Sequence, residues 1–371
     1  MVNLLHISSN QFPPLSEEHS TKKIWRELSK GFNQYHILAR SNSNKFESYS
    51  EGNIFLHLVP RWGSSKSFFF SSLYMLCIIK KYNINILLSQ CPLFGGVTAT
   101  LISRIKKIPL MVEVHGMIYF SILNSKVFYY KLISLLIKYT FDNATKVRSL
   151  SNVMTKMILS SSFKANVVEI PNRVNIGLFF PPKDNNNIVG TIKIISVGRF
   201  VWEKAFDVAI EAIKELRTEY EVELILIGGG PLQKKYYEIA KGVSYIKIMG
   251  RLKQEDFVPI LRSSDIYIQP SLSEGMPRTI LEAMAMGLPV ISSSVGAIPG
   301  ILRDNENGLL VKPGDKEDLK RKIELLIKNS VLRRTIACNG YSEVVEKYEW
   351  NKVFSQYRNE LTSMLEGDSP S

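Results

Sequence analysis

The chain has only three cysteines among its 371 residues, Cys77, Cys91 and Cys338, and they lie far apart. An odd, widely spaced set indicates neither a disulfide framework nor a zinc site. Long hydrophobic runs are missing too: the longest uncharged apolar run covers residues 67–79, whereas a bilayer-spanning helix needs about 20 residues. Residues 1–7 carry no basic segment ahead of their apolar run, which predicts a first strand instead of a secretory signal. These absences favour a reducing, cytoplasmic compartment.

Recognisable nucleic-acid modules are also absent: the sequence has no zinc-finger spacing and no aromatic RNA-binding signature. This bears on the charge, because the formal net charge is +13 at pH 7. Residues 1–180 contain 21 of the 47 basic and 8 of the 34 acidic residues, and the remainder holds 26 of each sign. The whole positive excess lies in the first half, where it favours an anionic membrane surface or a lipid-diphosphate acceptor over nucleic acid.

Apolar and amphipathic segments alternate along the chain, which predicts mainly parallel sheets covered by helices on both faces. Hydrophobic residues make up 45% and charged residues 22% of the chain, as in globular domains with an ample core. We expect strands at residues 2–7, 36–39, 54–58, 84–88, 110–114, 167–170, 192–197, 222–227, 245–249, 266–269 and 290–293, and helices at residues 22–32, 68–81, 97–107, 126–141, 152–159, 207–216, 278–286, 319–327 and 341–364. The expected domains are residues 1–178 and 191–350, with a polar, proline-containing linker at 179–190 and a C-terminal helix at 351–371.

The most informative segment is residues 271–289, in which Glu274 and Glu282 lie on either side of a Gly-Met-Pro turn. Pro277 suits the first position of a helix, because an N–H there would have no partner. The first helical turn favours an anion such as phosphate, and ionised carboxylates accept hydrogen bonds from sugar hydroxyls. Two glutamates at this spacing are also common on an exposed helix face. The segment alone leaves both a nucleotide-sugar site and a solvated surface open.

Three further segments occur in the order and spacing of a known family: residues 196–204, residues 226–232 and residues 290–311. Together with residues 271–289 they resemble the retaining glycosyltransferases of family 4. The resemblance covers residues 190–350 and is thinner before residue 180, where residues 113–116 and 170–172 carry it. It implies the α/β GT-B fold, in which two doubly wound Rossmann-like domains face a central cleft, and a C-terminal helix that packs back on the first domain.

The resemblance also implies a role for each motif residue. Arg199 and Lys204 neutralise the donor diphosphate, since fixed cations stabilise a departing phosphate; without the resemblance they are also explained as surface cations. Glu274 binds the transferred sugar and Glu282 the ribose hydroxyls. His115 faces the donor from the first domain, although a lone histidine after an apolar run is often structural. The other implied donor-binding positions are Gly198, Gly228, Gly229, Arg251, Leu252, Gly275, Met276, Pro277, Thr279 and Ile280.

The sequence departs from the family pattern at three places. Ala205 stands where the family usually has a glycine after the lysine. Residues 11–21 lack the Gly-Gly pair that approaches the diphosphate in many relatives, which leaves the acceptor open. Residues 172–175 read Asn-Arg-Val-Asn in place of Asn-Gly-Val-Asp. The Asp-x-Asp motif of the other large glycosyltransferase fold is absent, so we expect no metal and no other cofactor, with the fixed cations acting instead.

The expected reaction moves a hexose-type sugar from a nucleotide sugar to a glycan acceptor, lipid-linked, in the assembly of surface polysaccharide such as O-antigen, capsule or lipopolysaccharide. Residues 66–81 and 126–138 combine aromatic and basic residues, which predicts peripheral attachment to the inner face of the cytoplasmic membrane; core helices are the alternative for both. A nucleotide-sugar epimerase of the same fold is one rival function. A non-catalytic partner of another transferase is a second, disfavoured by the four charged residues at positions 199, 204, 274 and 282.

Overall fold

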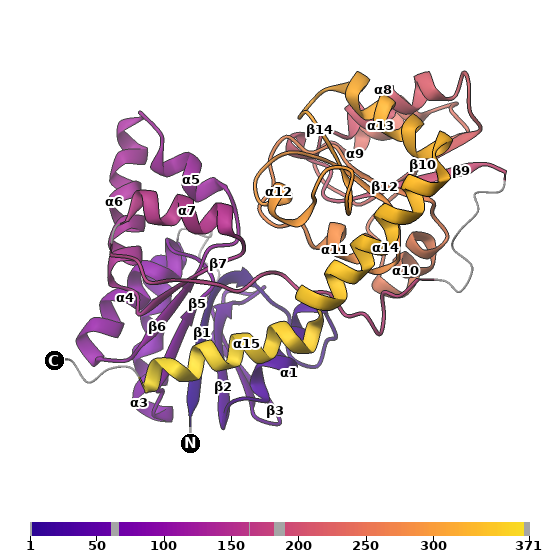
Figure 1. Ribbon diagram of the computed structural model, residues 1–371. Coiled ribbons are helices and arrows are strands. Elements are labelled where there is room, and N and C mark those ends of the chain that lie inside the picture. Colours follow the sequence, from indigo (N-terminus) through magenta and orange to yellow (C-terminus); the bar gives the residue numbers. More distant parts are fainter. Residues whose placement is uncertain (1, 61–66, 163, 182–189, 367–371) are drawn as a thin grey trace. The chain divides into compact units, whose positions relative to one another are not determined.

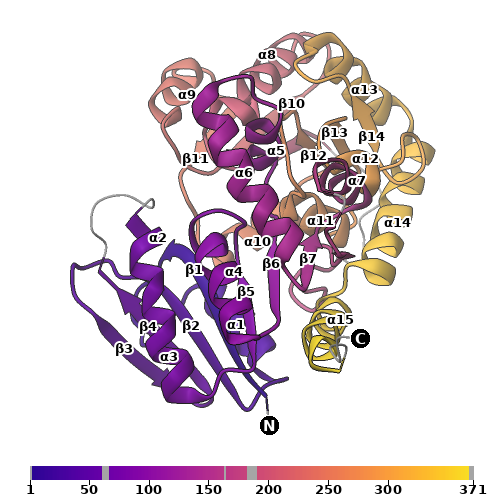
Figure 2. The same ribbon diagram turned by 90° about the vertical axis from the view of Figure 1, so that its left-hand side faces the viewer.

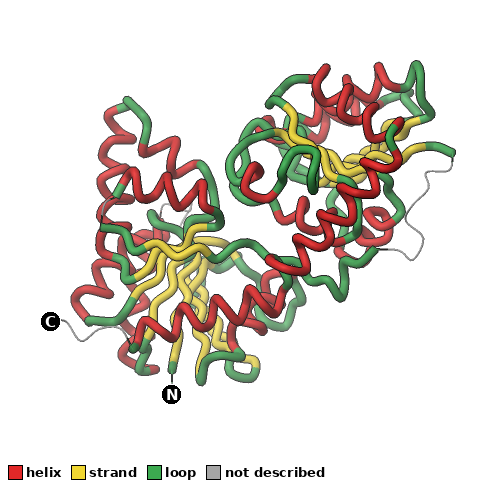
Figure 3. Tube along the Cα trace, in the orientation of Figure 1, coloured by secondary structure: helices red, strands yellow, loops and turns green. Residues whose placement is uncertain are grey.

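The computed structural model describes residues 2–60, 67–162, 164–181 and 190–366, and the chain divides into two compact units. Unit 1 comprises Met1–Ile170 with Phe354–Ser371, and unit 2 comprises Pro171–Val353. Each unit has a sheet of its own (Figures 1 and 3). Most of the predicted linker at residues 179–190 lies outside the described residues.

The division between the units falls before the predicted domain boundary at residue 178, because the intervening residues bond to unit 2. The N–H of Val174 donates to the carbonyl of Tyr348, at 2.9 Å. The Arg262 guanidinium donates to the carbonyl of Leu178, at 3.3 Å. The segment after Ile170 therefore belongs to the second unit by its hydrogen bonds.

Unit 1 is built on an eight-stranded sheet in the order β3-β4-β2-β1-β5-β6-β7-β8. Its strands are parallel, except that β3 is antiparallel to β4. The strands are β1 (Asn3–Gln11), β2 (Gln34–Arg40), β3 (Glu47–Glu51), β4 (Ile54–Val59), β5 (Ile86–Ser89), β6 (Leu110–Glu113), β7 (Lys146–Ser149) and β8 (Val167–Glu169). The sequence analysis missed β3 and β7. β3 is a polar edge strand, and β7 carries two charged residues in four, so neither has the apolar pattern that predicts a strand.

Helices cover both faces of this sheet. They are α1 (Ser20–Ser29), α2 (Phe68–Ser71), α3 (Met75–Tyr82), α4 (Phe94–Lys106), α5 (Ile118–Leu123), α6 (Phe128–Asn143), α7 (Asn152–Ser161) and the C-terminal α15 (Trp350–Thr362). Helices α2, α3 and α4 lie on one face (Figure 2), where Phe68, Met75 and Ile102 pack against Leu5 and Ile7 of β1. His6, between these two β1 residues, points to the opposite face, since side chains alternate along a strand.

Two predicted helices prove to be composite. Residues 68–81 form α2, a 3₁₀ turn at Ser72–Tyr74 and α3, and Lys66 lies outside the described residues. Residues 341–364 include the end of α14, all of α15 and part of a final 3₁₀ turn. Among the described residues, no helix has both the length and the apolar character needed to cross a bilayer.

Unit 2 contains a six-stranded, wholly parallel sheet in the order β11-β10-β9-β12-β13-β14. Its strands are β9 (Ile192–Val197), β10 (Val222–Ile227), β11 (Ile246–Met249), β12 (Ile266–Gln269), β13 (Val290–Ser293) and β14 (Leu309–Val311). Its helices are α8 (Phe206–Leu216), α9 (Gln233–Ala240), α10 (Gln254–Arg262), α11 (Arg278–Ala285), α12 (Ile298–Ile301), α13 (Lys316–Lys328) and α14 (Ser330–Lys347).

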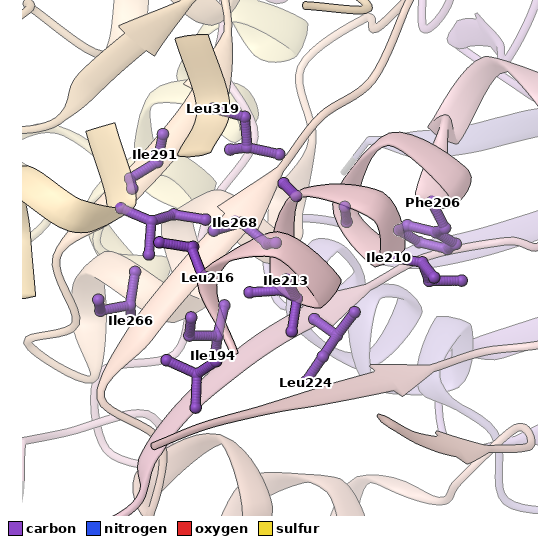
Figure 4. Packing of buried hydrophobic residues seen from close by; sticks show 14 of the residues in the cluster. Ile194, Phe206, Ile210, Ile213, Leu216, Leu224, Ile266, Ile268, Ile291 and Leu319 are labelled. Carbon is purple, nitrogen blue, oxygen red and sulfur yellow. The ribbon is translucent and has the colours of Figure 1, made fainter. Parts of the chain in front are cut away.

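The core of unit 2 forms where α8 and α13 pack on this sheet. Figure 4 shows Phe206, Ile210 and Ile213 of α8 against Ile194 and Leu224 of the strands. These α8 residues are the apolar stripe that helical periodicity predicts. Both units are α/β folds with parallel sheets, which confirms the predicted pair of Rossmann-like domains.

Candidate functional site

The motif residues of unit 2 gather at the carboxyl ends of three neighbouring strands. Gly198 follows β9 and Gly228 follows β10, while residues 270–276 follow β12. Strand β9 pairs with both β10 and β12, so the three loops are adjacent. In open parallel sheets this edge is where ligands bind.

Glycines bring two of these loops into direct contact. Gly228 has φ +153°, and a Cβ added there would lie 1.8 Å from the carbonyl oxygen of Gly198. A Cβ on Gly229 would lie 3.0 Å from Cγ of Arg251, and one on Gly198 would lie 3.3 Å from Cε of Lys204. Only glycine at position 228 permits the chain to lie this close to the Gly198 carbonyl. The structure thus brings together five of the predicted site residues.

Lys204 and Glu274 form the central ion pair of this cluster. Lys204 ends a 3₁₀ turn, Trp202–Lys204, and its Nζ lies 2.5 Å from Oε1 of Glu274. The same oxygen accepts hydrogen bonds from Nε2 of Gln269, at 2.7 Å, and from Oγ of Ser271, at 2.6 Å. No group in the described part of the chain donates to Oε2. Glu274 is therefore held firmly by one oxygen while the other is available to a ligand.

Gln269 and Ser271 are site residues that the sequence analysis missed. Both are buried, and the hydroxyl of Tyr267 donates to Oε1 of Gln269 at 2.6 Å, which fixes the amide orientation. Burial raises the pKa of Tyr267, so its phenol keeps the proton that it donates. Tyr267 and Gln269 are alternate residues at the end of the buried strand β12, and Ser271 is two positions further, in the loop that follows. Polar residues at every second position at the end of a buried strand are the sequence signal that could have identified them.

The turn from Glu274 to Met276 is held from two sides. Nδ2 of Asn172 donates to the Met276 carbonyl at 2.6 Å. Gly296 has φ +57°, and a Cβ there would lie 1.8 Å from the carbonyl oxygen of Glu274. The N–H of Ala297 donates to the Gly275 carbonyl at 3.1 Å. These contacts set the path of the chain into α11.

Helix α11 begins at Arg278, as predicted, and ends at Ala285, one residue before the predicted end, but Pro277 does not occupy the first helical position. Pro277 is its N-cap, with φ −70° and ψ 120°, and Arg278 is the first helical residue. A proline has no side-chain acceptor, and no described side chain accepts from the N–H of Thr279 or Ile280. The positive end of the helix therefore lies beside the Glu274 turn with donors to offer an anion.

Glu282 is a half-buried carboxylate on α11. Burial raises its pKa, and the charge of Arg278 opposes that shift only in part. Among the described residues, none donates a hydrogen bond to its carboxylate. An ionised group in this setting is costly unless a ligand supplies donors.

The remaining predicted positions of unit 2 lie on exposed loops. The Arg199 guanidinium is exposed and forms no ion pair with any described residue. Arg251 is exposed beside Gly229, and Leu252 follows it in the loop after β11, half-buried. In the described ranges, no three His, Cys, Asp or Glu side chains gather as they would around a metal ion.

His115 belongs to unit 1, directly after β6. Its Nε2 lies 3.0 Å from Oε2 of Glu113. The other oxygen of Glu113 accepts hydrogen bonds from Arg148 of β7 and from the hydroxyl of Tyr357 of α15. Burial alone would raise the pKa of Glu113, but the neighbouring His115 ring and the Arg148 guanidinium hold it well below its ordinary range. Glu113 is thus an ionised carboxylate that binds His115.

Comparison with known proteins finds relatives that are described as glycosyltransferases. The family model for glycosyl transferases group 1 matches residues 181–343. An uncharacterized glycosyltransferase of Methanocaldococcus jannaschii is 30% identical over 330 residues, covering 86% of this chain and 87% of the relative. The lipopolysaccharide core biosynthesis glycosyltransferase LpsE of Rhizobium meliloti is 32% identical over 174 residues, covering 46% of this chain and 49% of LpsE. The structure of Anabaena HepE in complex with UDP-glucose has a TM-score of 0.76 and 16% identity, covering 98% of this chain and 100% of HepE.

Proposed function

Because the chain belongs to the glycosyl transferases group 1 family, we propose that it is a retaining, family 4 glycosyltransferase that moves a hexose-type sugar from a nucleoside-diphosphate sugar to a glycan acceptor. The observation that carries this proposal is the cluster of Lys204, Glu274 and the start of α11 at the carboxyl ends of β9 and β12. The UDP-glucose bound to HepE, which has the same fold, supports a nucleotide-sugar donor.

Each residue of the cluster has a part that fits its chemistry. Lys204 and the exposed Arg199 neutralise the diphosphate, Lys204 as a point charge and Arg199 as a planar fork. The N–H groups of Thr279 and Ile280 add donors to the phosphate, and those of Gly275 and Met276 bind the sugar. Oε2 of Glu274 accepts hydrogen bonds from the sugar hydroxyls, since Lys204, Gln269 and Ser271 all bond to Oε1. The loop at Arg251 and Leu252 receives the base.

Glu282 accepts hydrogen bonds from the ribose hydroxyls, and these bonds offset the free-energy cost of burying its carboxylate.

In the transfer step, the bond from the anomeric carbon to the phosphate oxygen breaks, and a bond to the acceptor oxygen forms on the same face of the sugar. The acceptor proton passes to the departing phosphate oxygen. This front-face substitution assigns no protein nucleophile and no metal, and His115 contributes a polar group from unit 1.

The acceptor we propose is a lipid-linked glycan of surface-polysaccharide assembly, such as O-antigen or capsule. The relationship to LpsE, a lipopolysaccharide core enzyme by name, supports this class. A surface of unit 1 supports it too: Phe128 is 75% and Leu135 62% exposed on α6, next to Lys131 and Lys138. Apolar and basic side chains on one exposed helix suit the interface of an anionic bilayer. We therefore place the protein peripherally on the inner face of the cytoplasmic membrane.

Donor binding tests the enzymatic proposal. A panel of UDP-, GDP- and ADP-sugars is titrated calorimetrically into the wild type and into Arg199→Ala, with Arg262→Ala as the control arginine of unit 2. We expect one nucleotide sugar to bind the wild type and the control, and Arg199→Ala to weaken that binding at least tenfold, since a charged hydrogen bond is lost.

Incubation of the bound donor with purified lipid-linked glycan distinguishes the rival functions. Elongation of the glycan with an α-linkage supports the proposal. A free, altered sugar without acceptor indicates the epimerase, and binding of no donor by the folded protein favours a non-catalytic partner.

Sedimentation with vesicles tests membrane attachment separately. Vesicles containing anionic lipid are expected to bind the wild type, whereas neutral vesicles bind it weakly. Phe128→Ser/Leu135→Ser should lose this binding, and Val331→Ser, which removes an exposed apolar residue of unit 2, should keep it. Equal binding by all three proteins would contradict attachment through α6.

A further inference from the structure

The polar layer beneath the C-terminal helix has no part in the transfer step described above. It lies on the α15 side of the unit 1 sheet and connects the chain's last helix to His115. In register, Glu113 of β6 pairs with Arg148 of β7. Glu113 and Arg148 are both almost fully buried, and Figure 1 shows α15, drawn in yellow, crossing this sheet. A buried network of this kind is costly unless each member is satisfied.

The bonds divide the two carboxylate oxygens of Glu113 between two tasks. Oε1 accepts from Nη1 of Arg148 and from the Tyr357 hydroxyl, while Oε2 faces Nε2 of His115 at 3.0 Å. Arg148 is itself held by two more contacts: its Nε donates to the Ile170 carbonyl at 3.0 Å, and its guanidinium carbon lies 4.4 Å from the centre of the Tyr357 ring. The orientation of Glu113 is therefore set by β7 and α15 together.

An oriented, ionised Glu113 decides the tautomer of His115. An ionised carboxylate only accepts hydrogen bonds, so Nε2 of the neutral imidazole has to carry the proton. Nδ1 is then the acceptor nitrogen. No described residue bonds to Nδ1, and the ring is 37% exposed, so this nitrogen is available outside the network.

We propose that Tyr357 and Arg148 are positioning residues for His115, which act through Glu113 so that the C-terminal helix determines which ring nitrogen of His115 meets the substrate. The inference rests on the proposed function, which places His115 at the substrate. It goes beyond that function in giving α15 a part in the reaction, although α15 carries none of the predicted site residues.

The tautomer is read directly from the ring ¹⁵N shifts of the full-length protein labelled at its five histidines, with His115→Asn to assign the signals. The wild type should show the Nε2–H form of His115. In Glu113→Gln, Arg148 and Tyr357 still donate to the amide oxygen, so the amide NH₂ faces Nε2 of His115. Nε2 must then accept, and the tautomer should reverse to Nδ1–H. Tyr357→Phe should shift the His115 signals in the same direction, less far.

Glu360→Gln is the matched control. It replaces by a neutral amide the α15 carboxylate whose Oε2 lies 2.6 Å from Nζ of Lys146 on β7, without touching Glu113. We expect it to change stability but not the His115 signals. Retention of the Nε2–H form in Glu113→Gln, or equal signals in Tyr357→Phe and Glu360→Gln, would overturn the network.

Turnover of the donor found in the calorimetric panel then tests the link to the reaction. Glu113→Gln should lower kcat about tenfold or more, because the wrong nitrogen is presented, and should change the donor KM little. A reversed tautomer with an unchanged kcat would overturn the catalytic part of the inference. The ring signals need no substrate, so they test the network even if the transferase proposal fails.

Discussion

Lys204 Nζ and Glu274 Oε1 lie 2.5 Å apart, with side chains 15% and 9% exposed, so a cation proposed for the donor phosphates and a carboxylate proposed for the donor sugar are bound to each other. The pair joins the loop after β9 to the loop after β12, and the N–H of Leu272 donates to the Glu203 carbonyl beside it at 2.7 Å. The ion pair and this hydrogen bond together hold the two loops of the proposed donor site next to each other. Loss of either Lys204 or Glu274 should therefore also lower the free energy of unfolding.

Lys204→Met should lower the free energy of unfolding by about 2–3 kcal/mol, because Glu274 then keeps a buried charge with only two neutral donors. Urea denaturation measures this. Lys235→Met is the control: Lys235 pairs with Asp207 at 3.2 Å, but both side chains are well exposed, and its loss should cost less than about 0.5 kcal/mol. Equal losses in the two variants would mean that the Lys204–Glu274 pair behaves as a surface pair.

Glu282→Gln should stabilise the folded chain at pH 7 while weakening donor binding at least tenfold. The pKa of Glu282 is raised by burial. Below its ordinary value of about 4.5, folded and unfolded states both hold the proton and the group has no effect. Above it the unfolded chain loses the proton first, so the free energy of unfolding falls as pH rises, up to the raised value in the folded state.

The measurement for Glu282 is urea denaturation across pH 4 to 8. Glu282→Gln should remove part of the decline in stability, and the gap between variant and wild type should widen with rising pH. Glu211→Gln, at an exposed position of α8, is the control and should follow the wild type. A variant that is less stable than the wild type at pH 7 would contradict the burial cost.

Ala205→Gly should leave the protein as stable as the wild type or up to about 1 kcal/mol more stable. Ala205 has φ +46° and ψ 43°, a left-handed conformation that costs about 1–2 kcal/mol for a residue with a Cβ. The lost methyl burial, about 0.8 kcal/mol, offsets part of the gain. Ala209→Gly, inside α8, loses both its methyl and its helix propensity and should cost about 2 kcal/mol. Thermal unfolding in which both variants lose equally would count against strain at Ala205.

Gly228→Ala should destabilise unit 2 by about 3 kcal/mol or more, because the new Cβ would meet the Gly198 carbonyl and φ +153° is strained for alanine. Gly250→Ala is the matched control: nothing lies within 4 Å of its added Cβ. It should stay within about 1 kcal/mol of the wild type. If the circular dichroism melts of the two variants coincide, the close approach of the two loops is not required.

Individual strands and helices differ in how accurately the sequence predicted their boundaries. The strands ending at Val197, Ile227 and Gln269 were predicted to the residue, because buried parallel strands are short apolar runs that end in turn residues. The position of Pro277 was wrong by one place, since helix boundaries depend on backbone angles that a proline satisfies both as N-cap and as first residue. β7 was missed because Lys146 and Arg148 interrupt the apolar pattern that predicts a buried strand. Their ion pairs with Glu360 and Glu113 allow these charged residues to be buried.

By itself, the sequence determined the two α/β domains, because apolar periodicity is a local property of the chain. It also indicated the family, through the resemblance of residues 196–204, 226–232, 271–289 and 290–311 to known glycosyltransferases. Only the tertiary structure decided how those residues are satisfied: that one oxygen of Glu274 is taken by Lys204, Gln269 and Ser271, and that Tyr357 reaches Glu113 across 244 positions. Such contacts join residues far apart in the chain, and a hydrogen bond depends on where atoms lie in space, which no local pattern records.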